Sequence, residues 1–234
     1  GRHHIIWDAA KDVPDSMRSV TLTIQAIDDA EYLMVVDLSG GASASSYGAQ
    51  VYRGRNFSEW GDAYKSTYMV FRLIDPGVFR MGCETTEKGY WGYEAFPHDV
   101  AITKPFFMSI FETTQRQWEL VSGARPSTFN NNSCYATRPV ETVSYSMIRG
   151  DGDWPTDKTV SADSFVGKLR EKTGLSGFDL PTSAQWEYAC RAGTTTALNN
   201  GKNLSKTDVD ANLDKLARYY KKSMYRTRDG RVEY

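Results

Sequence analysis

The chain has 234 residues, and its 28 basic and 29 acidic side chains leave a formal net charge of −1, which excludes the strongly basic surfaces that bind nucleic acid or anionic membranes. No apolar run approaches the roughly 20 residues that a membrane-spanning helix needs. The three cysteines include no C-x-x-C pair, so zinc-ribbon and thioredoxin-like sites are excluded as well.

Two strand patterns lie within the first 30 residues. Residues 5–7 are apolar, and residues 19–26 alternate apolar and polar side chains as a half-buried strand does. Two strands cannot bury a core alone. We therefore interpret residues 1–30 as the closing strands of an upstream β-sandwich-like domain whose beginning lies outside this chain.

Residues 31–67 are predicted to form a bridge or linker between that fragment and a larger domain. Within them, the apolar run at residues 32–38 predicts a strand. The Ser- and Gly-rich run at residues 39–46 predicts a loop or flexible turn.

The larger domain, residues 68–234, opens with a predicted strand at residues 68–74. Pro76 and Gly77 have the chemistry of a turn, so we expect a hairpin between that strand and a second one at residues 78–81. Further extended segments are predicted at residues 100–103 and 106–110.

Capping residues and periodicity predict three helices. A fourth, short helix is predicted within residues 206–216. In the third helix, Thr182 is placed to cap the first turn, and Gln185, three residues on, to close a capping box. Glu187 points away from the Trp186 face and could pair with Arg191 at i,i+4. A glycine is expected to end each helix in the left-handed conformation. The three helices lie at about residues 113–123, 161–174 and 182–193, with an insertion-like loop at 150–159 before the second.

Four motifs occur in a fixed order along this domain. Residues 77–82 have the sequence GVFRMG, residues 105–118 PFFMSIFETTQRQW, residues 138–145 RPVETVSY and residues 178–193 FDLPTSAQWEYACRAG. Together they closely resemble the signature of the formylglycine-generating enzyme family, also called the sulfatase-modifying factor family. The chain is identified as a member of this family on that order of motifs.

The resemblance implies the fold class. It is α+β: an irregular C-type-lectin-like (sulfatase-modifying factor) fold with small sheets, two to four short helices and long loops, here preceded by a β-strand remnant. We expect four aromatic side chains in its core, those of Phe79, Phe106, Trp118 and Trp186. Because the family's later GNVWEW motif would follow Tyr234, the resemblance also implies that the domain is missing its C-terminal part.

The resemblance implies a chemistry as well. The founding enzymes of the family use dioxygen to oxidise a cysteine in a C-x-P-x-R segment of a sulfatase to formylglycine. A pair of cysteines beyond the GNVWEW motif binds copper(I), a soft ion that thiolates suit. None of Cys83, Cys134 and Cys190 matches those positions, so no catalytic residue is assigned. We expect copper only in a complete, active parent, and we expect this chain by itself to be inactive.

Cys190 has two interpretations. In family members a cysteine just after the W-E-Y sequence is often tied to a cysteine in the C-terminal part, and by that resemblance the partner of Cys190 lies beyond Tyr234. The alternative is that Cys190 is a small buried apolar side chain.

A structural calcium ion is also implied by the resemblance. Family members hold calcium in the loops after the W-E-Y helix through Asn and Asp side chains and backbone carbonyls, which are hard oxygen ligands. The corresponding ligands here would be the side chains of Asn212 and Asp229 and the carbonyls of Leu213 and Arg231. The alternative is that Asn212 and Asp229 are ordinary solvated residues.

The remaining polar residues do not indicate a self-contained metal centre. The three histidines, His3, His4 and His98, form no ligand-spaced cluster with Cys or carboxylates, and we expect a structural role for His98. Asp151 and Asp153, beside Trp154, could form a sugar or cation site, but a solvated loop is favoured.

Three functions remain open for the parent protein. It could be a sulfatase-modifying oxidase, or a related iron or copper oxidoreductase, that acts on a protein or peptide substrate. It could instead be a non-catalytic, lectin-like binding module with an unknown ligand, or an accessory factor of the same family. The upstream strands and the Ser- and Gly-rich bridge favour an exported multi-domain protein, and the insertion at residues 150–159 favours divergence from the enzymes. We therefore expect a bacterial protein that is secreted or located in the cell envelope.

Overall fold

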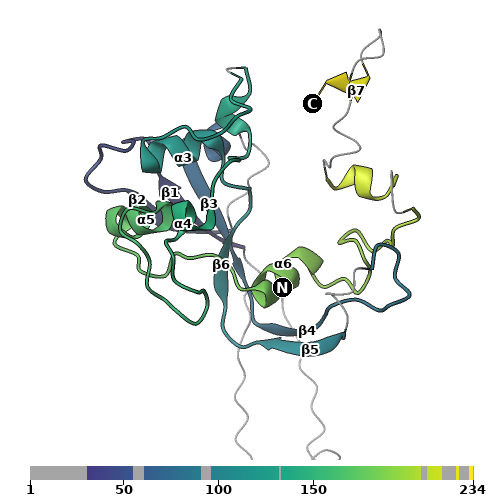
Figure 1. Ribbon diagram of the computed structural model, residues 1–234. Coiled ribbons are helices and arrows are strands. Elements are labelled where there is room, and N and C mark those ends of the chain that lie inside the picture. The colour runs from purple at the N-terminus through teal and green to yellow at the C-terminus, as the bar shows by residue number, and fades with distance from the viewer. Residues whose placement is uncertain are drawn as a thin grey trace, which may run out of the picture. The chain divides into compact units, whose positions relative to one another are not determined.

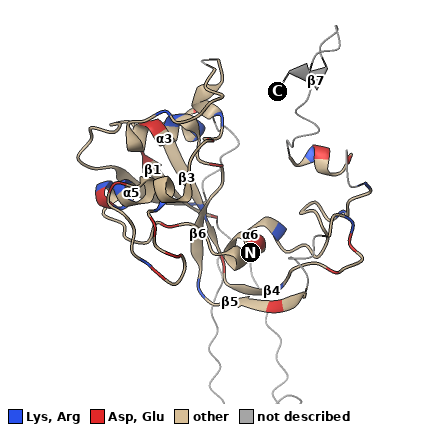
Figure 2. Ribbon diagram, viewed as in Figure 1, with Lys and Arg blue, Asp and Glu red and all other residues tan. Residues whose placement is uncertain are grey.

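The computed structural model describes residues 31–54, 61–90, 96–131, 133–206 and 210–217, together with the backbone of residues 225–226 and 232–233. Residues 1–30 lie outside the described residues, so the upstream fragment stays a prediction. Among the described residues, every helix is too short or too polar to span a bilayer. Both signs of charge occur along the same helices, as Figure 2 shows for α3, α5 and α6.

A four-stranded antiparallel sheet forms the centre of the domain (Figure 1). Its strands lie in the order β2-β1-β3-β6. They are β1 (Tyr32–Asp37), β2 (Gly48–Arg53), β3 (Tyr68–Ile74) and β6 (Phe106–Ser109). A short helix, α2 (Ala63–Ser66), precedes β3.

The interior strand β1 is buried on both faces. Its Met34 and Val36 contribute to the main core, whereas Leu33 and Val35 join a second apolar cluster with Val70. A strand buried on both faces has a continuous apolar run instead of an alternating one, as residues 32–38 do.

The position of β1 differs from the predicted bridge. Residues 31–67 were assigned to a linker, but β1 and β2 pair with each other, and β1 also pairs with β3 of the larger domain. The Ser- and Gly-rich run at residues 39–46 is the connection between β1 and β2. Its end is held by Tyr47, whose hydroxyl donates to the carbonyl of Leu120, 2.9 Å away. The turn-forming residues 39–46 therefore connect two paired strands within the domain and are not part of a linker between domains.

A second, two-stranded antiparallel sheet contains β4 (Gly77–Met81) and β5 (His98–Ile102). The expected hairpin between residues 68–74 and 78–81 is wrong, because β3 pairs with β1 and β6 and thus has both edges occupied. The chain leaves the first sheet at Pro76 and Gly77, so β4 finds a different partner.

Helices α3 (Gln115–Ser122) and α5 (Phe165–Thr173) pack on the central sheet through the main core (Figure 1). The rings of Trp118 and Phe165 stack with centroids 4.8 Å apart. Both helices end as predicted, at Gly123 and Gly174 with positive φ. Helix α3 also begins as predicted, after the N-cap Thr114, whereas α5 begins later than residue 161, after the N-cap Ser164. The remaining short elements are α4 (Tyr145–Ile148), the 3-10 turns Tyr135–Thr137 and Leu213–Lys215, and the strand pair β7 (Tyr225–Arg226) and β8 (Val232–Glu233).

Helix α6 (Ser183–Arg191) contains the most distinctive motif of the chain. The predicted capping box is present, since Thr182 and Gln185 each accept a hydrogen bond from the backbone N–H of the other. The helix ends one residue earlier than expected, because Ala192 already has a φ of 48°.

The expected aromatic core is confirmed only in part. Trp118 is buried, and Phe79 and Phe106 are partly buried. Trp186 is 55% exposed, so its assignment to the core is wrong. Helix α6 contacts β4 and β5, and Tyr188 faces β4 through its contact with Phe79. Because Trp186 is two residues away, it lies about 200° around the helix and faces away from that sheet. The α+β class, with small antiparallel sheets and short helices, is as expected.

Candidate functional site

Helix α6 is joined to the end of β4 by a charged pair on its surface. Glu187 and Arg191 form the predicted ion pair at 2.8 Å. The Glu187 Oε1 atom also accepts a hydrogen bond from the backbone N–H of Gly82 at 2.8 Å. Arg191 Nη2 donates to the carbonyl of the same glycine at 2.7 Å. Both backbone groups of Gly82 are thus held by one helix, and this fixes where the turn after β4 begins.

A cleft of about 460 Å³ lies beside this contact, lined by β4, the turn after it and the end of α6. Its apolar lining includes Val78, Phe79 and Pro97, together with the ring of Tyr188. Phe79 and Tyr188 are in contact, with ring centroids 5.3 Å apart. Gly77 lies against the same ring, and a Cβ atom there would overlap the Tyr188 hydroxyl and force that side chain to shift.

The charged lining of the cleft consists of two arginines and two glutamates. Arg80 and Arg191 lie on β4 and α6, whereas Glu84 and Glu87 lie on the turn after β4. The volume is in the range of ligand-binding pockets, which span roughly 300–1,000 Å³. Sequence analysis identified the Glu187–Arg191 pair but not the cleft, because its lining comes from segments that are far apart in the chain.

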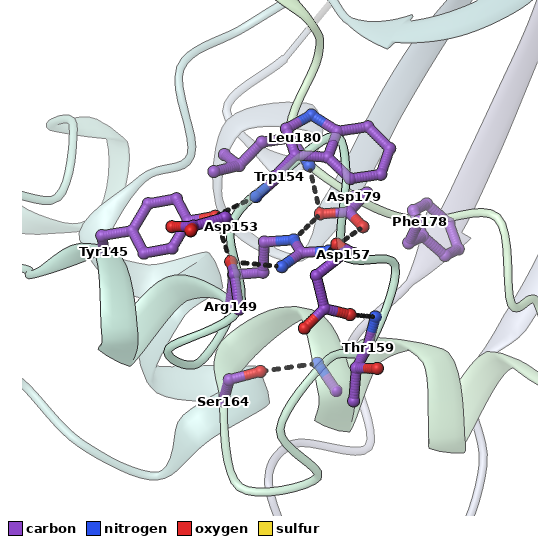
Figure 3. Close-up of polar contacts among 12 residues, drawn as sticks. Tyr145, Arg149, Asp153, Trp154, Asp157, Thr159, Ser164, Phe178, Asp179 and Leu180 are labelled. Carbon is purple, nitrogen blue, oxygen red and sulfur yellow. Dashed lines mark hydrogen bonds and ion pairs between the residues drawn. The ribbon is translucent and has the colours of Figure 1, made fainter.

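A second polar centre surrounds Arg149, whose side chain is fully buried (Figure 3). Arg149 Nε donates to Asp179 Oδ1 at 2.7 Å, and Arg170 Nη2 donates to Asp179 Oδ2 at 2.9 Å. Arg149 also donates to the carbonyls of Gly152, at 2.8 Å, and Asp157. Arg149 therefore binds oxygen atoms of both the loop at residues 150–159 and Asp179, and it connects this loop to the start of the α6 motif.

Among the described residues, the acidic side chains of that loop belong to no group that could hold a metal ion. The Tyr145 hydroxyl donates to the carbonyl of Gly152. It also accepts a hydrogen bond from the backbone N–H of Trp154 (Figure 3). The carbonyl of Asp153 accepts from the backbone N–H of Asp157 at 2.7 Å. Hydrogen bonds from Tyr145 and Arg149 and within its own backbone therefore order the loop. Asp151 and Asp153 are exposed, in keeping with the favoured interpretation of a solvated loop.

The predicted calcium ligands are only partly within the described residues. Asp229 and Arg231 lie outside them. The Asn212 side-chain nitrogen donates to the carbonyl of Asn203 at 3.1 Å. The Leu213 carbonyl accepts from the backbone N–H groups of residues 216 and 217. Amide and carbonyl oxygens of this kind suit calcium, and the site stays a prediction.

Sequence analysis missed Asp210, the residue that organises this loop. Its side chain is 1% exposed. It accepts hydrogen bonds from the Ser205 hydroxyl and from the backbone N–H groups of Ser205, Lys206, Asn212 and Leu213. The Ser205 hydroxyl bond is the largest cause that holds the pKa of Asp210 well below its usual range. An isolated Asp in a polar stretch gives no sequence signal of such a role.

No disulfide joins Cys83, Cys134 and Cys190 to one another. Cys83 is buried beside the cleft, and Cys134 and Cys190 are exposed. The alternative that Cys190 is a buried apolar side chain is therefore wrong, whereas a disulfide with a cysteine beyond Tyr234 stays a prediction. His98 begins β5, and its Nδ1 atom forms a hydrogen bond of 2.9 Å with the carbonyl of Phe96. Within the described ranges, no group of three or more His, Cys, Asp and Glu side chains is arranged to hold a metal ion.

Comparisons with known proteins agree with the order of motifs. The family model of the sulfatase-modifying factor enzyme 1-like domain matches residues 56–233. A curated relative, the chaperone protein LppX of Paenibacillus barcinonensis, is 30% identical over 141 residues, which cover 52% of this chain and 45% of that protein. The chain thus spans about half the length of this relative. No solved structure gives a significant match. With its small antiparallel sheets, short helices and four ordered motifs, the chain has the C-type-lectin-like fold and belongs to the sulfatase-modifying factor family.

Proposed function

We propose that this chain is a non-catalytic accessory module that binds an extended segment of a partner polypeptide. The observation that carries the proposal is the cleft between β4 and α6. It combines an apolar wall with charged side chains, as sites for peptides do. The ion pair of Glu187 and Arg191 holds Gly82 on both its backbone groups, so the cleft is formed before any partner arrives, and binding orders fewer groups.

The rim of the cleft offers apolar surface to such a partner. Val78 on β4 is 71% exposed although it lines the cleft. A polypeptide that covers it would remove apolar area from water, which favours association. The relative in Paenibacillus barcinonensis is named a chaperone protein, and a polypeptide-binding role for this chain agrees with that name. The strand pattern of residues 1–30 supports a parent that is secreted or located in the cell envelope.

The proposal is tested with a permanently unfolded client, reduced and carboxymethylated α-lactalbumin, whose binding to the 234-residue chain is measured by fluorescence anisotropy. Val78→Ser removes the apolar rim, and Val51→Ser is the matched control because Val51 is also exposed (57%) but lies on the edge strand β2. We expect the unsubstituted chain and the Val51→Ser control to bind the client with similar affinity. Val78→Ser should bind about five- to tenfold more weakly, because the loss of one apolar side-chain contact costs about 1 kcal/mol or slightly more. Absence of binding, or equal binding by all three proteins, would refute the proposal.

A second candidate function is favoured by the family match over residues 56–233. In it, the parent oxidises a sulfatase cysteine to formylglycine, and copper(I) would supply the activation of dioxygen. None of Cys83, Cys134 and Cys190 matches the positions of the family's copper-binding cysteines. The chain and the product of the complete parent gene are incubated with a C-x-P-x-R peptide, and the aldehyde is trapped with a hydrazide. We expect no aldehyde from the 234-residue chain. Aldehyde formed by this chain would overturn the non-catalytic proposal.

A further inference from the structure

The charges that line the cleft between β4 and α6 are not balanced. Arg191 is paired with Glu187 at 2.8 Å and is also bound to the carbonyl of Gly82. Arg80 is paired with Asp99 at 3.4 Å. Both carboxylate partners lie outside the lining of the cleft. Within the described part of the chain, the side chains of Glu84 and Glu87 have no hydrogen bond or ion pair, so the uncompensated charge in the cleft is negative.

The two glutamates are presented by a turn that is held in place. The backbone N–H of Glu87 donates to the carbonyl of Glu84 at 2.9 Å. Before them, Gly82 is bound by α6 through Glu187 and Arg191. After them, Lys88 Nζ donates to the carbonyl of Ser205 at 2.6 Å. Because the turn is anchored on both sides, the backbone that carries Glu84 and Glu87 keeps its place relative to the cleft wall, and a bound cation requires only side-chain rearrangement.

The aromatic wall of the cleft is a second feature that favours a positively charged group. Tyr188 and Phe79 are in contact at 5.3 Å between ring centroids and both line the cleft. The face of an aromatic ring carries partial negative charge and attracts a guanidinium or ammonium group. A cleft with apolar rings and unpaired carboxylates therefore suits a side chain that has an apolar stem and a cationic end, which is a description of lysine and arginine.

From these features we infer that the cleft binds a lysine or arginine side chain of the partner polypeptide, with its charged end at Glu84 and Glu87 and its stem along Tyr188. This inference rests on the proposed function and names the class of segment that the module selects. Exposed carboxylates in a cleft that is open to solvent contribute modestly, so we expect each of the two to account for about two- to fivefold in affinity. The preference should weaken as salt shortens the range of the attraction.

The test uses two fluorescent octapeptides that differ at one central position, which is arginine in one and citrulline in the other. Citrulline has nearly the same shape as arginine but no charge. Their dissociation constants are measured for the 234-residue chain at about 20 mM and 200 mM salt, which correspond to long and short screening lengths. We expect about a tenfold preference for the arginine peptide at low salt, and a smaller one at high salt.

Two variants assign the preference to the cleft. The double variant Glu84→Gln and Glu87→Gln should reduce the preference to less than about twofold. Glu171→Gln is the matched control, since it removes the same charge from an exposed position on α5, and it should keep the full preference. Arg80→Gln should strengthen binding of the arginine peptide, because it removes a like charge from the lining.

The outcomes separate the inference from the function on which it rests. If neither peptide binds and the unfolded client does not bind either, the proposed function fails. If both peptides bind equally, or if the double variant keeps the preference, only the inference of a cationic side chain in this cleft is overturned. A preference that is lost in the double variant and kept in Glu171→Gln supports it.

Discussion

Replacing Gly167 by alanine tests the packing of α5. We expect the substitution to destabilise the protein, whereas helix propensity alone predicts that it stabilises the helix. Gly167 lies in the first turns of α5, where alanine is normally more stable than glycine by about 1 kcal/mol. A Cβ atom here would overlap the carbonyl oxygen of Ser161 and come within 2.9 Å of its carbonyl carbon and 3.0 Å of the Ala162 Cα. All three are backbone atoms, so no side-chain rotation relieves the contact.

The magnitude follows from what would have to move. The Ser161 carbonyl accepts hydrogen bonds from the backbone N–H of Ser164 at 3.0 Å and from the Ser164 hydroxyl at 2.7 Å. The backbone N–H of Ser161 donates to the carbonyl of Arg149. Overpacking costs about 1–3 kcal/mol, and a disturbed N-cap adds about 1 kcal/mol. Subtracting the gain in propensity leaves a net destabilisation of about 2 kcal/mol. For a domain of this size, that lowers Tm by about 4–8 °C.

The assay is thermal and urea unfolding of the 234-residue chain followed by circular dichroism. Gly177→Ala is the matched control, because a Cβ atom at Gly177 would meet no atom within 4 Å. We expect this control to change the free energy of unfolding by about 0.5 kcal/mol or less. If Gly167→Ala is as stable as the parent chain, or more stable, the close approach of α5 to residues 161–162 does not exist as described.

Three further predictions concern the α6 motif and the loop that follows it. Thr182→Ala removes the hydroxyl that caps α6 and should cost about 1 kcal/mol in unfolding free energy; Ser183→Ala, next in the chain, should not, and equal effects would contradict the cap. The Asp210 pKa lies below its unfolded value of about 3.9, so the stability that its ionised form contributes is present above that pH and is lost as the pH falls through the folded value. The Tm difference between the chain and Asp210→Asn should therefore shrink between about pH 5 and pH 2, and a constant difference would argue against it. Calcium added to a chelator-treated sample should give heat in titration calorimetry and a higher Tm, both lost in Asp229→Asn; no heat and no shift in the unsubstituted chain would reject the calcium site.

The elements that could be predicted are those whose determinants are local. Helices α3, α5 and α6 carry their own caps within four residues of sequence, as Thr182 and Gln185 illustrate. The identity of the family could be recognised because four short motifs occur in order, and this needs no knowledge of how they contact each other. The Glu187–Arg191 pair was predictable for the same reason, since four residues make one turn of helix.

Pairing and burial were less accessible, because they depend on segments that are distant in the chain. Nothing near Pro76 and Gly77 shows that both edges of β3 are taken by β1 and β6, so a hairpin was expected where the chain changes sheets. The apolar face of α6 was assigned to the core, although the sheet lies on the side of Tyr188 and leaves Trp186 exposed.

By itself, the sequence determined the family, the α+β class and the presence and approximate position of the three longer helices, because capping residues and motif order are features of consecutive residues. Only the tertiary structure decided the candidate site. The cleft joins β4, Pro97 and the end of α6, which are separated by up to about a hundred residues, and the buried Arg149 meets Asp179 thirty positions on. Such contacts arise when sheets and helices pack, and a pattern of residues within one segment does not contain them.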